Sequence, residues 1–201
     1  MGRHADCVDS SDMSHILIVY GTTEGHTAKI AEAIRAGVIR TGAEADVVLA
    51  GTADPRPDHY AGVIVAGSIH AGGYQKALKK WIRAHVSELG SKPTALVTVC
   101  LAVLEKDPKV AAELDAIVTR FTQETGWHPA TKKLVAGALL YTQYNFFKRW
   151  IMKRIAAKAG GDTDVSRDYD YTDWNDVMAF GERFGRQITK AAAPAVLAAA
   201  G

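Results

Sequence analysis

The segment from Gly21 to Thr27 carries the residue types best suited to binding a ligand. It reads Gly-Thr-Thr-Glu-Gly-His-Thr and lies between an apolar run at 16–20 and a helical pattern formed by Ile30, Ile34 and Val38. A strand, loop and helix in this order bring backbone N–H groups, hydroxyls and the positive end of the helix dipole to one point, where a phosphate can bind. The residues of this loop predicted to bind the ligand, which we expect to be a cofactor, are Thr22, Thr23, Glu24, Gly25, His26 and Thr27.

The same loop argues against two kinds of nucleotide site. It has no Gly-Lys-Ser/Thr for a nucleoside triphosphate and no Gly-x-Gly-x-x-Gly for a dinucleotide. It also contains no Lys or Arg, so it would neutralise a phosphate with dipoles and hydroxyls alone. The pattern therefore favours a buried monophosphate ester, and the alternative is a Gly/Thr-rich turn without a ligand.

Composition favours one domain in a reducing compartment. The chain has 201 residues and 48% apolar content, enough for one sizeable core, and a net charge of +2 gives no reason to expect nucleic acid as a partner. Cys7 and Cys100 have no metal-ligand spacing, so neither a metal site nor a disulfide framework is predicted. No apolar run approaches eighteen residues. We expect a cytoplasmic protein with a polar, disordered leader at 1–13.

Short apolar strands and amphipathic helices alternate along the rest of the chain. This alternation predicts an α/β fold, a doubly wound five-stranded parallel sheet in the order 2-1-3-4-5. In such a sheet the loops after strands 1, 3 and 4 converge on one crevice. We expect this domain to cover 14–192, with an insert at about 141–172 and a frayed tail at 193–201. The expected strands are 16–20, 45–50, 62–67, 94–100 and 133–140.

Tyr20–Thr27 resembles the phosphate loop of flavodoxins, and this resemblance implies FMN as the cofactor. Three further stretches, Ala66–Tyr74, Ala136–Tyr141 and Met152–Asp164 followed by Tyr171–Trp174, are similar to the flavodoxin-type, quinone-dependent protoporphyrinogen oxidases of bacteria. The similarity implies a helical insert after the fifth strand. It also implies oxidation of protoporphyrinogen IX to protoporphyrin IX in haem synthesis, with electrons passing through FMN to a membrane quinone.

In flavodoxins two loops enclose the flavin ring, and the resemblance assigns them here to the ends of the third and fourth strands. The fourth-strand loop contains no aromatic side chain, so we expect one ring face to stay open to a planar substrate. No residue is singled out as a catalytic acid or base. The predicted ring-binding residues are Ser68, Ile69, His70, Gly72, Gly73 and Tyr74 in one loop and Leu101, Ala102 and Val103 in the other.

A basic segment at 145–158 lies within the expected insert and contains no acidic residue. Basic amphipathic helices bind anionic lipids or anionic ligands, so we expect contact with the porphyrinogen or with the inner face of the cell membrane. The alternative is a solvated helix docked on its own domain. The residues predicted to make this contact are Lys148, Arg149, Trp150, Lys153 and Arg154.

Two other functions fit the same fold. One is a flavodoxin-like quinone reductase that is fed by NADH or NADPH. The other is an electron-transfer protein, which would dock to its partner by charge. The loop after the fourth strand favours an enzyme over a carrier, because an uncovered ring face admits a planar substrate.

Overall fold

The computed structural model describes residues 14–70, 72–140, 164 and 166–199. Within these ranges it contains a five-stranded parallel sheet in the order β2-β1-β3-β4-β5. This confirms the predicted fold class and strand order. The strands are β1 (His15–Gly21), β2 (Glu44–Leu49), β3 (Gly62–Ser68), β4 (Thr94–Val99) and β5 (Thr131–Val135).

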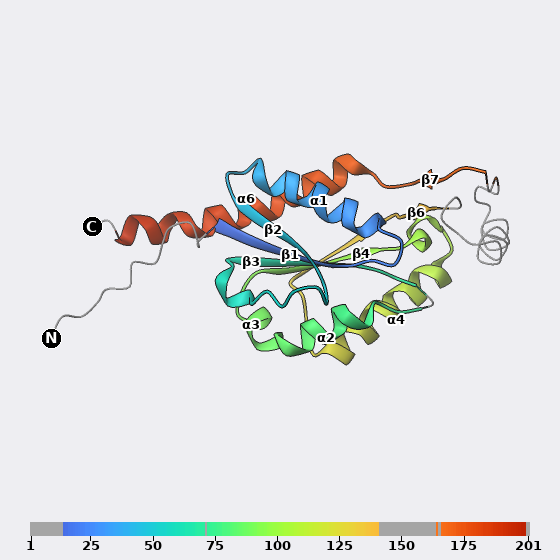
Figure 1. Ribbon diagram of the computed structural model, residues 1–201, viewed down its shortest axis with the longest axis horizontal. Helices are drawn as coiled ribbons and strands as arrows, with labels where there is room; N and C mark the ends of the chain where they lie inside the picture. The colour runs from blue at the N-terminus through green and yellow to red at the C-terminus, as the bar shows by residue number, and fades with distance from the viewer. Residues whose placement is uncertain (1–13, 71, 141–163, 165, 200–201) are drawn as a thin grey trace.

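Helices cover both faces of the sheet (Figure 1). On one face lie α1 (His26–Ile39) and α6 (Trp174–Ala199), and on the other lie α2 (Lys76–Ala84), α3 (Val86–Gly90) and α4 (Pro108–Thr125). Two 3-10 turns, η2 (Pro57–His59) and η3 (Leu101–Leu104), lie in the connections. Since β1, β3 and β4 are parallel, the loops that follow them meet at one edge of the sheet.

The core is divided between the two faces by the alternation of the central strands. In β1, Ile16 and Ile18 pack with the side chains of α1 and α6, whereas Leu17 and Val19 pack with those of α2 and α4. All four side chains are fully buried. A continuous apolar run is therefore required in β1, as expected for a parallel strand that is covered on both sides.

The sequence predicts one amphipathic helix from Leu78 to Leu89, and this prediction is wrong. The structure has two helices, because His85 leaves the helical conformation with φ −121° and ψ 21°. Its Nε2 lies 2.9 Å from Asp54 Oδ1, so a contact outside the helix holds the break. The predicted apolar face is nevertheless buried on both sides of the break, as Leu78 and Leu89 show.

The fifth strand also differs from the prediction of 133–140. β5 ends at Val135, and the chain then leaves the sheet to form β6 (Ala138–Leu139), which pairs antiparallel with β7 (Tyr169–Asp170). At the other end of the chain, α6 continues as a helix to Ala199, across residues expected to fray.

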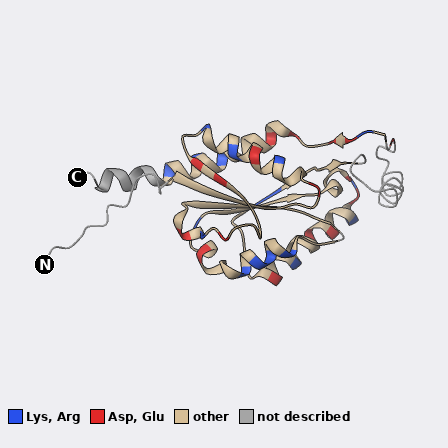
Figure 2. Cartoon of the chain, viewed as in Figure 1, with Lys and Arg blue, Asp and Glu red and all other residues tan. Residues whose placement is uncertain are grey.

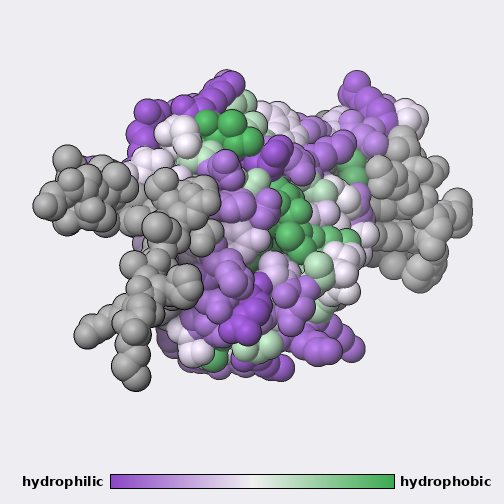
Figure 3. Space-filling view, turned by 60° about the vertical axis from the view of Figure 1, so that its left-hand side comes forward, coloured by the Kyte–Doolittle hydropathy of each residue, from purple (hydrophilic) through white to green (hydrophobic). Residues whose placement is uncertain are grey.

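The surface carries both charge signs. Figure 2 shows basic residues grouped along α2, which contains Lys76, Lys79, Lys80 and Arg83. The face in Figure 3 is largely hydrophilic, with hydrophobic colour limited to small areas. Among the helices that the structure describes, none combines the length and the apolar character needed to cross a membrane.

Candidate functional site

The Gly21–Thr27 loop lies at the carboxyl end of β1 and leads directly into α1. Gly25 is the N-cap with φ 84°, a left-handed conformation that favours glycine, and its N–H donates to Thr22 Oγ1 at 2.9 Å. The first turn of α1 contains no acidic residue. The Ala28 N–H donates to the Gly25 carbonyl oxygen at 3.1 Å, whereas the N–H groups of His26 and Thr27 precede the first helical carbonyl partner and can face a ligand. The start of α1 therefore suits an anionic ligand.

Gln75 joins this loop to the loop after β3. Its Nε2 donates to Ser68 Oγ at 2.8 Å and approaches Thr23 Oγ1 at 3.2 Å. A Cβ atom at Gly21 would lie 2.8 Å from Gln75 Oε1, so a larger residue at position 21 would displace the Gln75 side chain. The sequence analysis missed Gln75, because its partners are 7 and 52 residues away and no local pattern marks them.

The loop after β3 closes into a tight hairpin. His70 and Gly73 exchange two backbone hydrogen bonds of 2.9 and 3.1 Å, and Gly72 has φ 76°. Arg120 of α4 donates from its guanidinium to the Gly72 carbonyl oxygen at 2.8 Å, a contact that sequence reasoning also missed. A Cβ at Gly72 or Gly73 would meet no atom within 4 Å, so both glycines border open space. Ser68 is buried and Ile69 is half-buried at the start of this loop.

Tyr74 does not present its ring to the crevice. Its side chain is 6% exposed, its ring centroid lies 4.1 Å from that of Phe121, and its hydroxyl lies 2.6 Å from Thr98 Oγ1. Burial raises the pKa of Tyr74 to about 12. The Tyr74 ring therefore packs between the sheet and α4, and the flavin contact of Tyr74 stays a prediction.

The loop after β4 forms η3. Leu101, Ala102 and Val103 are half-buried, and the Cys100 thiol caps the turn by accepting from the Ala102 N–H at 3.4 Å. Burial raises the pKa of the Cys100 thiol, so it stays protonated near neutral pH. Cys100 therefore caps η3, and the residues Leu101, Ala102 and Val103 of η3 are aliphatic.

His26 is the first residue of α1, but its ring faces away from the turn at Gly25 towards the chain that enters α6. Its Nε2 lies 2.7 Å from Thr172 Oγ1 and 3.6 Å from Asp170 Oδ1. The Trp174 ring packs against it at 5.6 Å between centroids. Thr27, the next residue, is 1% exposed. His26 thus contacts the chain that enters α6, whereas Thr22 accepts from Gly25 and Thr23 accepts from Gln75.

The lowered pKa of His26 predicts that the stability of the folded protein depends on pH. Burial lowers its pKa below the ordinary 6.5, against the opposing effect of Asp170, and Lys29 adds to the lowering. The unfolded chain therefore takes up this proton at higher pH than the folded protein. The stability that neutral His26 contributes is complete above about pH 6.5 and is lost as the pH falls through the interval between the two pKa values.

The variant His26→Gln keeps an Nε2 donor and cannot titrate in this range. Calorimetric Tm values of the wild type should therefore fall relative to those of His26→Gln between about pH 7.5 and about pH 5. A difference in Tm that stays constant over this interval would show that the folded protein does not perturb His26.

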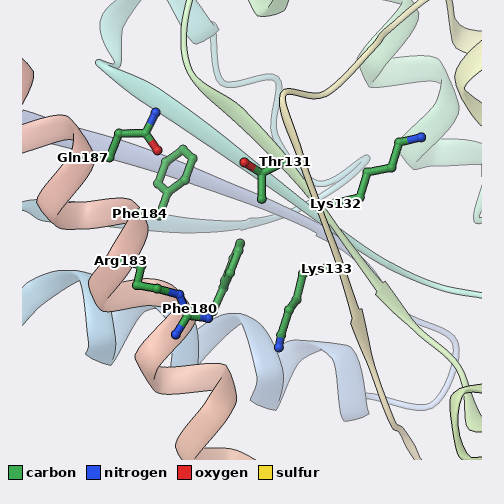
Figure 4. Close-up of a pocket in the computed structure, with 7 residues that line it drawn as sticks. All are labelled: Thr131, Lys132, Lys133, Phe180, Arg183, Phe184 and Gln187. Atoms are coloured by element: carbon green, nitrogen blue, oxygen red, sulfur yellow. The ribbon is translucent and has the colours of Figure 1, made fainter.

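In the described part of the chain, at least two cavities lie away from the loops. One, of about 250 Å³, lies between β5 and α6. Figure 4 shows that the Thr131 and Lys133 side chains of β5 point toward α6, whereas that of Lys132 points away. Its floor is formed by Phe180 and Phe184. The other, of about 430 Å³, lies between Trp81 and the turn after β2. None of the predicted site residues lines either cavity.

The basic residues of 145–158 lie outside the described residues, and the structure does not place them. In the described part of the chain, no group of three or more His, Cys, Asp or Glu side chains is arranged to hold a metal ion.

Comparison with known proteins shows which families and structures this chain is similar to. A flavodoxin domain model matches residues 17–166. Protoporphyrinogen IX dehydrogenase (quinone) of Escherichia coli K12 is 30% identical over 175 residues, covering 87% of this chain and 96% of that protein. The protein of the same name from Leishmania major is 33% identical over 178 residues, covering 87% and 76%. An archaeal flavodoxin structure gives a TM-score of 0.51 at 13% identity, covering 87% and 99%.

The strand order and the loop–helix turn after β1 define a protein of the flavodoxin-like class. The chain belongs to the flavodoxin domain family, and its relatives make it an oxidoreductase of that fold. Membership of this family implies a flavin cofactor.

Proposed function

We propose that this protein is an FMN-dependent protoporphyrinogen IX dehydrogenase that delivers electrons to a membrane quinone in haem synthesis. The observation that carries the proposal is the 30% identity to a protein of that name, sustained over 87% of this chain and 96% of the relative. This similarity extends over most of both chains and is not confined to the phosphate loop, which supports a shared site.

The donor set at the start of α1 supports FMN over a dinucleotide. One helix N-terminus and the hydroxyls of Thr22, Thr23 and Thr27 make a cradle for a single phosphate. The space beside Gly25 is open, since a Cβ there would meet no atom within 4 Å. These residues would hold the phosphate without a Lys or Arg, which leaves the binding free energy to hydrogen bonds and the helix dipole.

The two ring loops support an enzyme that admits a planar substrate. Gly72 and Gly73 would let backbone approach one side of the ring, and η3 would cover part of the other side with Leu101, Ala102 and Val103. Tyr74 belongs to the core, so neither it nor η3 supplies an aromatic cover. A bound flavin accepts electrons from an organic substrate and returns them to a quinone.

Side-chain contacts within the protein hold the phosphate loop and the ring loop in fixed relative positions. Gln75 links Ser68 to Thr23, and Arg120 fixes the Gly72 carbonyl, so the phosphate loop and the ring loop are tied through α2 and α4. Orientation of a bound cofactor and substrate is the contribution that such contacts make to a redox reaction.

An anaerobic experiment tests this function. Protoporphyrinogen should bleach the flavin absorbance of the purified protein, and a menaquinone or ubiquinone analogue should restore it while porphyrin fluorescence appears. NADH and NADPH are the control reductants. Neither should bleach the flavin at a rate comparable to that with protoporphyrinogen. A flavin that is inert to porphyrinogen but reduced by NADPH would replace this function with that of a quinone reductase.

We also place the protein in the cytoplasm, with peripheral contact with the membrane that holds the quinone. The cations of 145–158 support contact with anionic head groups, where each basic residue contributes about 1 kcal/mol. Supplying the quinone in vesicles with and without anionic lipid adds this comparison to the same assay. Equal rates with both vesicle types would argue against the membrane contact alone.

A further inference from the structure

The short ribbon formed by β6 and β7 joins two distant parts of the chain at its base. Ala138 pairs with Asp170 and Leu139 with Tyr169. Below these pairs the Tyr171 N–H donates to the Gly137 carbonyl oxygen at 3.2 Å. The ribbon therefore brackets the whole segment between Leu139 and Tyr169.

The base of the ribbon contacts both sides of the proposed flavin site. Thr172 lies against His26, the first residue of α1, at 2.7 Å between Oγ1 and Nε2. Leu139, Tyr169 and Tyr171 form a small apolar cluster with Leu101 of η3. In Figure 1 the ribbon leaves the body of the domain at the end where β6 and β7 are labelled, away from the two chain termini.

The direction of the hydrogen bonds at Thr172 follows from its single hydroxyl proton. The Thr172 hydroxyl lies 2.9 Å from the Ala136 carbonyl oxygen, which can only accept, so the hydroxyl donates there. It must then accept from His26, whose Nε2 carries the proton. His26 is 7% and Thr172 9% exposed, so each is shielded from water as an alternative partner.

Asp170 fixes the backbone around Thr172. Asp170 Oδ1 accepts from the Thr172 N–H at 3.0 Å, and Asp170 Oδ2 accepts from Trp174 Nε1 at 3.2 Å. The chain from β7 to the start of α6 is thus held in one conformation with its hydroxyl aimed at His26.

We propose that His26 is a positioning residue of the flavin site: its Nε2–H holds the base of the β6–β7 ribbon against the first turn of α1, so that the ribbon and the bound cofactor order each other. The inference rests on the flavin site of the proposed function. It does not depend on which substrate reduces the flavin.

Energetic coupling of this kind is reciprocal. If the His26–Thr172 contact helps to order the phosphate loop, FMN must in turn stabilise that contact by the same factor. Two backbone amides report on the ribbon base, since the Tyr171 N–H bonds to Gly137 and the Thr172 N–H to Asp170. FMN should slow hydrogen exchange at both amides, although neither residue belongs to the phosphate or ring loops.

Four proteins test the proposal: the wild type, His26→Ala, His26→Gln and Thr172→Val. His26→Gln retains an Nε2 donor and serves as the rescue, whereas Thr172→Val keeps the side-chain shape and removes the hydroxyl. FMN affinity, measured by quenching of flavin fluorescence, should fall about fivefold or more in His26→Ala and Thr172→Val. It should stay within about twofold of the wild type in His26→Gln.

Hydrogen exchange separates coupling from general destabilisation. FMN should protect Tyr171 and Thr172 in the wild type and in His26→Gln, and this protection should be lost in His26→Ala and Thr172→Val. Unchanged FMN affinity in Thr172→Val, or equal protection in all four proteins, would overturn the inference and leave the proposed function intact. If His26→Ala does not fold, Thr172→Val decides alone. If the wild type binds no FMN, both the inference and the flavin site are overturned, whereas inertness to porphyrinogen affects only the proposed substrate.

Discussion

Replacing Gly181 by alanine should lower the free energy of unfolding by about 3 kcal/mol or more, although alanine is the better helix former. A Cβ at Gly181 would fall on the Ile34 carbonyl oxygen of α1, and one at Gly37 would fall on the Met178 carbonyl oxygen of α6. The obstacle in both cases is backbone, which cannot rotate out of the way. The two helices must separate and uncover part of the core that they share, including Ile34 and Phe180.

For a chain of this length a loss of about 3 kcal/mol lowers Tm by about 6–12 °C. Thermal unfolding followed by circular dichroism measures the shift, and Gly37→Ala should match it. Gly90→Ala is the control, because a Cβ there would meet no atom within 4 Å and the residue ends α3. Equal Tm values of Gly181→Ala and Gly90→Ala would contradict the close approach of α1 and α6 at Gly37 and Gly181.

The parts of this fold that the sequence predicts are those determined by local pattern. The apolar run of β1 and the turn at Gly25 mark a parallel strand and a helix start, and the alternation of elements predicts the sheet order. These features depend on neighbours along the chain, so no knowledge of distant residues is needed.

Contacts between distant residues account for what the sequence could not predict. The helical period through Leu89 is correct, but Asp54, 31 residues earlier, holds His85 at a break between two helices. Tyr74 stands in a loop that could present its ring to a ligand, yet Thr98 and Phe121 draw the side chain into the core. Periodicity predicts which side of an element is buried and does not predict which loop side chains turn inward.

The same limit applies to His26. Its place at the start of a helix after a glycine predicts a ligand contact as readily as a structural one. Only the fold brings Thr172 to it from 146 residues away and gives its Nε2 proton an acceptor. Gln75 is a parallel case, since nothing in the sequence indicates that a side chain one residue before α2 joins two loops.

The substitutions Thr23→Val and Thr27→Val together should weaken FMN binding at least about tenfold. Each removes a hydroxyl from the proposed phosphate cradle, and a hydrogen bond to a charged group contributes about 1.5–3 kcal/mol. Thr27 is 1% exposed at the first turn of α1, so water cannot easily replace its hydroxyl. Thr23 is exposed, but its Oγ1 also accepts from Gln75 Nε2, so its loss loosens the link to Ser68 as well.

The two single variants distinguish these contributions. Thr27→Val should account for most of the loss in affinity, because its site is the more buried and valine preserves the side-chain shape. Thr23→Val should have the smaller effect. Thr131→Val, an exposed change at the start of β5 and remote from the loops, is the matched control and should leave the dissociation constant unchanged. Flavin fluorescence titration measures all four proteins. Equal affinity of the double variant and Thr131→Val would place the phosphate outside this loop, because a cradle that lacks Lys and Arg has few other donors to replace the two hydroxyls.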